Sequence, residues 1–115
     1  AVQSENCAPF YETEEQGSSS LVEVTPKPTL AEGIAIGKPA RASEVLDMIR
    51  RHNVKVITAP EDRILPCREE MAKRGFYVEH TTAAALAAYY RYCKKFGPTE
   101  DALLSLCGAG LKSEH

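Results

Sequence analysis

Apolar and polar positions follow helical and strand spacings in turn along most of the chain. Residues 43–53 repeat apolar positions at helical spacing, and residues 54–58 are β-branched and mostly apolar, which favours a buried strand. Residues 60–74 return to helical spacing, although Pro66 should kink that helix or delay its start. The alanine-rich residues 81–96 give the clearest predicted helix. Strands that alternate with helices indicate parallel strands joined by right-handed crossovers.

The two ends of the chain extend this α/β pattern. Residues 2–5 alternate like the end of a strand, and residues 9–16 predict a short helix that Gly17 stops. Near the other end, residues 102–106 predict a buried strand that leads directly into a glycine turn, and residues 76–78 predict at best a short strand. The fold class is therefore α/β, a partial parallel sheet with flanking helices.

Helix ends and organisation follow from small polar residues and loops. Ser43 is placed to cap one helix, and Thr81 or Thr82 to cap another. We expect one domain of 115 residues. Residues 1–42 should hold a strand end, a short helix and loops, and residues 43–112 an alternating helix/strand unit that ends at the glycine turn.

Composition excludes several classes of function. The formal net charge of −2 argues against a basic nucleic-acid surface, and no apolar run approaches the roughly 20 residues that a membrane helix needs. The four cysteines are too scattered for the tight hairpin of a zinc site, so no metal is expected. Without a recognisable export signal they favour reduced thiols in a cytoplasmic protein, although a disulfide pair stays open.

The most informative motif follows the last predicted strand as Cys107-Gly108-Ala109-Gly110. In an open α/β sheet, ligands lie beyond the carboxyl ends of the strands, and glycines there let a backbone pass close to a flat ligand. Taken alone, the motif also fits a plain glycine turn after a strand.

Several segments together, in order and spacing, resemble one enzyme family. They are residues 2–9, 29–34, 39, 54–57, 75–79, 83–87 and 106–112. This series is similar to the C-terminal third of the pyridoxal-phosphate enzymes of the tryptophan-synthase-β type, called fold type II. Within that group the ending 107–112 most resembles threonine synthase, whose last strand typically ends Thr-Gly-His-Gly-Leu-Lys. The resemblance implies the C-terminal part of a large cofactor-binding domain, pyridoxal 5'-phosphate as cofactor and an amino-acid substrate.

The resemblance also implies roles for particular residues. Cys107 occupies the position that faces the pyridine nitrogen of the cofactor, and Gly108 lies beside it against the ring. Gly33 matches a glycine whose backbone approaches the ring, and Glu79 matches a glutamate near the ring edge. A small buried hydrophobe at Cys107, a turn glycine at Gly33 and a surface glutamate at Glu79 are the structural alternatives. His80 stands where the family usually has proline.

Two parts that the family's chemistry needs have no match in this chain. These are the lysine that forms the Schiff base and the glycine-rich phosphate cradle, which lie N-terminal to the matched region in the family. We therefore expect a C-terminal fragment with no catalytic residue of its own, inactive alone, whose partner is the missing N-terminal part. The parent is expected to be a threonine-synthase-like lyase that converts O-phosphohomoserine and water to threonine and phosphate.

Other interpretations stay open at this point. The parent could be a serine/threonine dehydratase or diaminopropionate ammonia-lyase relative, or the chain could be a stand-alone α/β interaction module. A sheet cut at its edge leaves unpaired strands and an apolar face, so we also expect a homo-oligomer.

Overall fold

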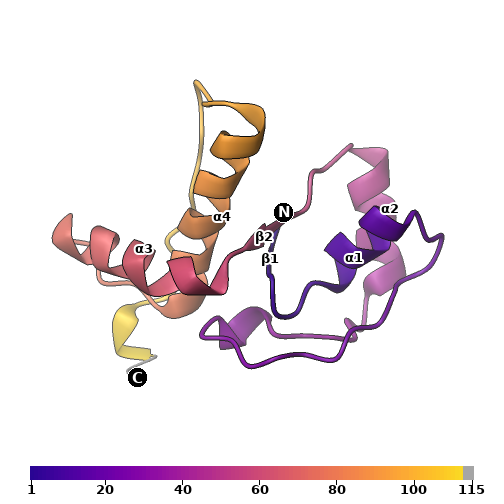
Figure 1. The fold of residues 1–115 in the computed structure, drawn as a ribbon, viewed down its shortest axis with the longest axis horizontal. Coiled ribbons are helices and arrows are strands. Elements are labelled where there is room, and N and C mark those ends of the chain that lie inside the picture. Colours follow the sequence, from indigo (N-terminus) through magenta and orange to yellow (C-terminus); the bar gives the residue numbers. More distant parts are fainter. Residues whose placement is uncertain (113–115) are drawn as a thin grey trace.

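The computed structural model describes residues 1–112 and arranges them as a small open α/β structure (Figure 1). In chain order the elements are β1 (Val2–Ser4), α1 (Pro9–Gln16), the 3-10 turn η1 (Glu32–Ile34), α2 (Ala42–Arg51), β2 (Ile57–Ala59), α3 (Glu61–Lys73), α4 (His80–Phe96) and the 3-10 turn η2 (Gly110–Lys112). Helices α3 and α4 lie on one side of the two strands, and α1 and α2 lie on the other.

The two strands form a parallel pair, as the alternating pattern predicts. Val2 lies opposite Ile57 and Ser4 opposite Ala59. Helix α4 packs on both strands, and α3 packs in turn along α4. Parallel strands are normally covered on both faces. Here the chain leaves β1, passes through α1 and α2, and returns as β2, which lies beside β1 and parallel to it.

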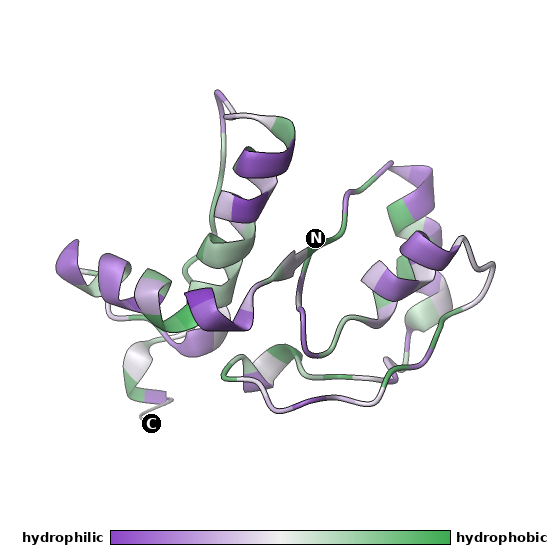
Figure 2. Ribbon diagram, viewed as in Figure 1, coloured by the Kyte–Doolittle hydropathy of each residue, from purple (hydrophilic) through white to green (hydrophobic). Residues whose placement is uncertain are grey.

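The core lies between α3, α4 and strand β2. Ile64, Cys67 and Met71 face inward from α3 at helical spacing, as the sequence predicts. Opposite them α4 presents four buried alanines, which allow its backbone to come close to its neighbours. Figure 2 shows the result as apolar colour on the inner turns of both helices and polar colour on their outer ends.

Two helices follow the predicted boundaries closely. Helix α1 ends at Gly17, which has a left-handed φ of 65°. Helix α3 begins after Pro60 and continues through Pro66 without a break. Pro66 lies on the exposed face, so the carbonyl of exposed Asp62 that it leaves without a helical partner is accessible to water. The expected delayed start is therefore wrong, because the helix begins at Glu61, and the expected kink stays a prediction.

The predicted caps are also wrong. Helix α2 begins at Ala42 with Arg41 in the capping position, so Ser43 lies inside the first turn. Helix α4 begins at His80 with Glu79 in the capping position, and no side chain caps it. Thr81 and Thr82 therefore lie in its first turn, where their hydroxyls are available to other segments.

The predicted strands are shorter in the structure, because each needs a partner. Residues 54–56 lie outside β2, which pairs only where β1 runs beside it. Residues 76–78 form a single antiparallel bridge from Val78 to Ala109. Residues 102–106 form no strand, and their burial is also contradicted, since Leu103 is 98% exposed. Neither described strand reaches this segment.

Candidate functional site

A short antiparallel ribbon brings the glycine turn to the start of α4. The amide of Glu79 donates to the Gly108 carbonyl at 2.9 Å, and the amide of Gly110 donates to the Tyr77 carbonyl at 2.9 Å. The bridge between Val78 and Ala109 lies between these two hydrogen bonds. The turn that follows the last extended segment is thereby held against the N-terminus of α4.

Arg68, which extends from α3, ties this ribbon together. Its Nε donates to the Val78 carbonyl at 2.8 Å and its Nη2 to the Gly110 carbonyl at 3.2 Å. Its guanidinium also lies 4.9 Å from the centre of the Tyr77 ring, within the range of cation–π contacts. The Arg68 side chain thus contacts both halves of the ribbon. Because its guanidinium is charged, these hydrogen bonds are stronger than those between neutral groups.

Gly108 is buried, and the side chain of Glu79 leaves no room for a Cβ at this position. A Cβ at this position would overlap the carboxyl group of Glu79. Its amide donates to Thr82 Oγ1 at 3.2 Å, so the first turn of α4 holds the turn directly. Gly33 also lies close to the first turn of α4, since a Cβ on it would be 3.0 Å from Thr81 Oγ1.

The structure therefore brings Gly33, Glu79 and Gly108, three of the residues singled out in the sequence, to one place, the first turn of α4. Cys107 precedes Gly108 directly and is exposed, with its Sγ 3.3 Å from Ser105 Oγ. The N-terminus of a helix carries partial positive charge, which suits an electron-rich ligand.

The four thiols are free and differ in exposure. Cys107 is exposed, Cys93 is partly buried, and Cys7 and Cys67 are buried. Burial raises the pKa of the thiols of both Cys7 and Cys67, and for Cys67 the nearby Arg63 opposes this effect in part. The buried pair packs as small apolar side chains, and Cys107 is available to a ligand.

A polar network holds the loop that carries Gly33. Glu61, in the first turn of α3, accepts hydrogen bonds from Thr29 Oγ1 at 2.6 Å and from the Leu30 amide at 2.6 Å. Ser4, at the end of β1, donates to Thr29 Oγ1 at 3.0 Å. Sequence analysis missed this network, as it missed Arg68. In the sequence, Glu61 indicates only that a negative charge lies at the start of a helix, where the helix dipole favours it. Its neighbours in the sequence do not point to Thr29, which lies 32 residues away.

Cys107 is the residue at this turn whose chemistry suits one edge of pyridoxal phosphate. An exposed thiol is a neutral hydrogen-bond donor for a ring nitrogen, whereas the sides of Gly33 and Gly108 on which a Cβ would lie are occupied by Thr81 and Glu79. Glu79 fills the space beside Gly108 and leaves no room there for a ring. The absence of a Cβ at Gly108 therefore allows the glutamate to come close. The cofactor's phosphate would need backbone donors from elsewhere, since the chain has no run of glycines.

Metal sites and membrane spans are both absent from the described part of the chain. Residues 1–112 contain no group of three or more His, Cys, Asp or Glu side chains that could hold a metal ion. Within the same range, none of the helices combines the length and the apolar character needed to cross a membrane.

Comparisons with known proteins agree with the resemblance seen in the sequence. Residues 1–108 match the family model described as pyridoxal-phosphate dependent enzyme. Among solved structures, a threonine deaminase from T.th. matches 82% of this chain with a TM-score of 0.67 and 20% sequence identity. None of the curated proteins matches the chain.

The structural match covers 34% of the threonine deaminase chain, so this chain spans about a third of that structure. The parallel pair β1–β2 and the four described helices correspond to the C-terminal part of the family fold, which confirms the predicted fold class. The family's cofactor is pyridoxal phosphate, as expected. The chain belongs to the family of pyridoxal-phosphate dependent enzymes.

Proposed function

We propose that this chain supplies the side of a cofactor site that faces the ring nitrogen of pyridoxal phosphate, in a threonine-synthase-like lyase. The proposed reaction converts O-phosphohomoserine and water to threonine and phosphate. The observation that carries the proposal is the meeting of Gly33, Glu79 and the Cys107–Gly108 turn at the start of α4. These segments are far apart in the sequence, and they meet at a turn that begins with an exposed thiol.

Each residue has a specific task in this proposal. When bound, pyridoxal phosphate supplies an electron sink for the amino-acid substrate. Cys107 donates its S–H to the ring nitrogen, and a neutral donor leaves that nitrogen largely unprotonated, which moderates the sink. Gly33 would bring its backbone toward the ring, whereas Gly108 allows Glu79 to lie beside the turn that carries Cys107. Glu79 stays beside Gly108 because its own amide is bonded to the Gly108 carbonyl at 2.9 Å.

The lysine and the phosphate cradle of the site would come from another part of the enzyme. The seven lysines of this chain lie in segments that match neither motif. In this proposal the 115-residue chain alone therefore has no lyase activity. It contributes a wall of the site and the thiol that tunes the cofactor.

The enzyme that unites this chain with the lysine-bearing part provides the test. We expect kcat/KM for O-phosphohomoserine to exceed the values for serine and threonine by about tenfold or more, a difference of about 1.4 kcal/mol in transition-state binding. Cys107→Thr, which keeps a neutral donor, should retain activity. Cys107→Asp should change both the cofactor absorbance and the pH profile, and Cys93→Thr is the control at a partly buried thiol away from the turn. Faster turnover of serine or threonine would contradict the proposed substrate.

A dehydratase is the second candidate. Its support is the fold match to a structure named as a threonine deaminase. A serine/threonine dehydratase or a diaminopropionate ammonia-lyase would use the same wall of the site with another substrate. The ending Gly110-Leu111-Lys112 favours threonine synthase. Dehydratases are typically similar to a Gly-Gly-Asn ending at the same place. The same three-substrate assay distinguishes them.

A further inference from the structure

A cavity of about 450 Å³ lies between the start of α3 and the second half of α4. Helix α3 contributes Asp62 and Arg63 to its walls, and α4 contributes Tyr90, Arg91 and Lys94. Pockets that hold small molecules typically measure about 300–1,000 Å³, so this cavity has room for one. The three α4 residues lie about two to three helical turns beyond the candidate site at the first turn of that helix.

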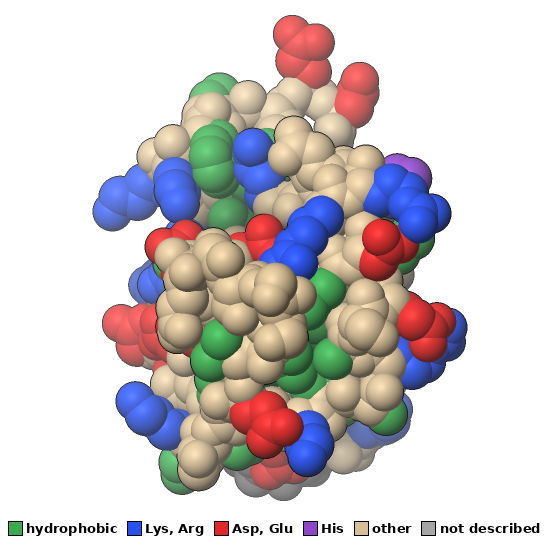
Figure 3. Space-filling model, turned by 90° about the vertical axis from the view of Figure 1, so that its right-hand side faces the viewer, with side chains coloured by type: hydrophobic (Ala, Val, Ile, Leu, Met, Phe, Trp, Pro, Cys, Tyr) green, Lys and Arg blue, Asp and Glu red, His purple; other side chains and the backbone are tan. Residues whose placement is uncertain are grey.

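The walls of this cavity are cationic, although the formal net charge of the chain is −2. Three of the lining side chains, Arg63, Arg91 and Lys94, carry positive charge, and Asp62 carries the single negative charge. On the face of the molecule shown in Figure 3, by contrast, side chains of both signs lie among one another. The side chains that line the cavity therefore have a net charge of +2, which favours an anionic ligand.

Two of these cations have no partner among residues 1–112. Within that range, neither Arg63 nor Lys94 donates a hydrogen bond from its side chain or forms an ion pair. The other arginines each have a carboxylate or a carbonyl partner within the described residues. A guanidinium and an ammonium that line a cavity without an acceptor are available donors for the oxygen atoms of a ligand.

The third cation, Arg91, is held in place by residues of the two strands. Its Nη1 donates to Thr58 Oγ1 at 2.6 Å and to the Thr58 carbonyl at 3.1 Å. Its Nη2 lies 3.4 Å from the Glu5 carboxylate, which is longer than the roughly 2.7–2.9 Å of a strong charge-assisted hydrogen bond. The guanidinium is therefore preorganised, and its Nη2 can still donate to an anion at a small entropic cost.

The start of α3 adds a backbone donor to the same cavity. The Glu61 amide donates to the Glu5 carboxylate at 2.8 Å, and the Arg63 amide donates to the Pro60 carbonyl at 3.1 Å. Within residues 1–112, the Asp62 amide between them donates to no acceptor. Because the start of a helix also carries partial positive charge, this wall favours an anion together with the three cations.

The cavity also has an apolar side. Pro60, Ala87 and Tyr90 line it. The Tyr90 hydroxyl already donates to the Glu70 carboxylate at 2.7 Å, so Tyr90 presents its half-exposed ring rather than its hydroxyl to a ligand. An anion that carries a small apolar group therefore fits these walls better than a bare ion.

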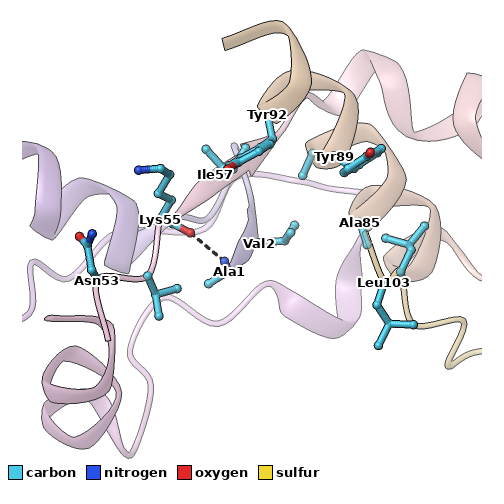
Figure 4. Close-up of a pocket in the computed structure, with 12 residues that line it drawn as sticks. Ala1, Val2, Asn53, Lys55, Ile57, Ala85, Tyr89, Tyr92 and Leu103 are labelled. Atoms are coloured by element: carbon cyan, nitrogen blue, oxygen red, sulfur yellow. Dashed lines mark hydrogen bonds between the residues drawn. The ribbon is translucent and has the colours of Figure 1, made fainter. Parts of the chain in front are cut away.

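The cavity beside strand β1, about 430 Å³ in volume and drawn in Figure 4, differs in this respect. Its two ammonium groups, those of Ala1 and Lys55, both have partners. The Ala1 ammonium donates to the Lys55 carbonyl at 2.8 Å, and Lys55 Nζ lies 4.8 Å from the centre of the Phe96 ring. The other side chains that line it are neutral, so the cavity between α3 and α4 is the better anion site.

We propose that the cavity between α3 and α4 binds a small phosphate monoester. Its phosphoryl group would contact Arg63, Arg91 and Lys94, and its ester group would contact the ring of the neighbouring tyrosine, Tyr90. A phosphoryl group suits the site better than a carboxylate, because it presents three strong acceptor oxygens to two guanidinium groups and an ammonium. Inorganic phosphate shares this chemistry without the ester group, and the experiment below distinguishes the two.

The proposal goes beyond the proposed function and does not depend on the reaction. The residues that line the cavity belong neither to the glycine turn nor to the first turn of α4 that holds it. Binding can be measured without cofactor or substrate, so failure of this proposal and failure of the proposed function are distinguishable.

The experiment titrates the 115-residue chain with phenyl phosphate at constant ionic strength and follows its backbone amides by NMR. We expect saturable shifts of the amides of residues 61–63 and 87–94, with a Kd of about 1 mM or below. Inorganic phosphate should shift the same amides but bind about fivefold or more weakly, because it lacks the ring that contacts Tyr90. Benzoate, which has the ring but only a carboxylate, should also bind more weakly than phenyl phosphate.

Matched variants locate the ligand. Arg63→Gln and Lys94→Gln should each raise the Kd about tenfold, and because both side chains are exposed, neither should change the urea midpoint. Lys95→Gln removes the same charge from the next residue of α4, which does not line the cavity, and should change the Kd by about twofold at most. Arg63→Lys keeps the charge but not the planar fork, so its Kd should lie between those of the natural chain and Arg63→Gln. Circular dichroism confirms that each variant folds.

Four results would overturn the proposal. The first is the absence of a saturable shift at about 20 mM phenyl phosphate. The second is equal weakening by Lys94→Gln and Lys95→Gln, which would mean that the charge of the helix rather than the cavity attracts the anion. The third is inorganic phosphate that binds as tightly as phenyl phosphate, which would assign the site to the free ion. The fourth is tighter binding of a blocked tetraglutamate peptide, which would assign the cavity to an acidic segment of a protein.

Discussion

Gly108→Ala tests the packing at the start of α4 most sharply. The added Cβ would overlap the carboxyl group of Glu79, whose backbone is held by its hydrogen bond to the Gly108 carbonyl. The backbone of Gly108 has no positive φ, so alanine can adopt it without strain. Overpacking of this kind costs about 1–3 kcal/mol. The reduced freedom of the unfolded chain offsets about 0.4–1 kcal/mol. The net loss of stability should be about 1–2 kcal/mol.

A double-mutant cycle with Glu79→Ala assigns this cost to the contact. The Glu79 side chain makes no capping hydrogen bond to α4, so its truncation mainly empties the space that the new Cβ needs. Urea unfolding is followed by circular dichroism. Gly108→Ala should lower the midpoint by about 0.5–1 M in the natural background. In the Glu79→Ala background it should have little effect or raise the midpoint slightly.

Equal losses in the two backgrounds would refute the reasoning. Such a result would mean that a contact other than the one with Glu79 requires glycine at this position. Ala109→Gly, at the exposed neighbour, is the control for a change in local chain flexibility.

Three further predictions concern thiols, pH and the ribbon. Iodoacetamide should alkylate exposed Cys107 well before Cys67, because burial raises the pKa of the Cys67 thiol. Peptide mass spectrometry measures the order of alkylation, and equal rates at the two thiols would contradict the burial of Cys67. The hydrogen bond to Glu70 raises the pKa of Tyr90, so its stabilisation is full below the ordinary tyrosine pKa of about 10 and is lost as pH rises through the higher folded-state value. The urea midpoint of Tyr90→Phe should therefore fall less steeply above about pH 10, and an unchanged slope would contradict this. Arg68→Ala should cost about 1.5–3 kcal/mol and speed amide exchange in the ribbon, whereas unaltered exchange would show that Arg68 does not hold it.

Local patterns in the sequence predicted the elements that their own residues stabilise. Helix α1 runs from Pro9 to the glycine that ends it, and α4 runs through its alanine-rich body to Phe96. The inward stripe of α3 was also predicted, because Ile64 and Met71 recur at helical spacing. In each case the helix needs mainly backbone hydrogen bonds within itself and one apolar face.

The predictions that were wrong depend on partners that a local pattern does not reveal. Residues 102–106 have the composition of a buried strand, but a strand forms only beside another, and the described sheet does not reach them. Ser43 has the chemistry of a cap, yet the helix begins one residue earlier. Pro66 was expected to disturb α3, but its position on the exposed face lets the helix continue.

The candidate site was predicted by resemblance rather than by pattern. Matching of motifs in order singled out Gly33, Glu79 and Cys107, and the fold places all three at or beside the first turn of α4. The residues that hold this arrangement, Arg68 and Glu61, were missed because their partners are carbonyls, amides and a hydroxyl of other segments. Long-range contacts to backbone groups leave no trace in residue type.

A crystal structure of the enzyme that unites this chain with its lysine-bearing part, with pyridoxal phosphate bound, is the most direct measurement. The account predicts that the Sγ of Cys107 lies within hydrogen-bonding distance of the pyridine nitrogen, with the backbone of Gly33 beside the ring and Glu79 still packed against Gly108. A ring bound elsewhere, with the Cys107 thiol facing solvent or packed against protein, would contradict it.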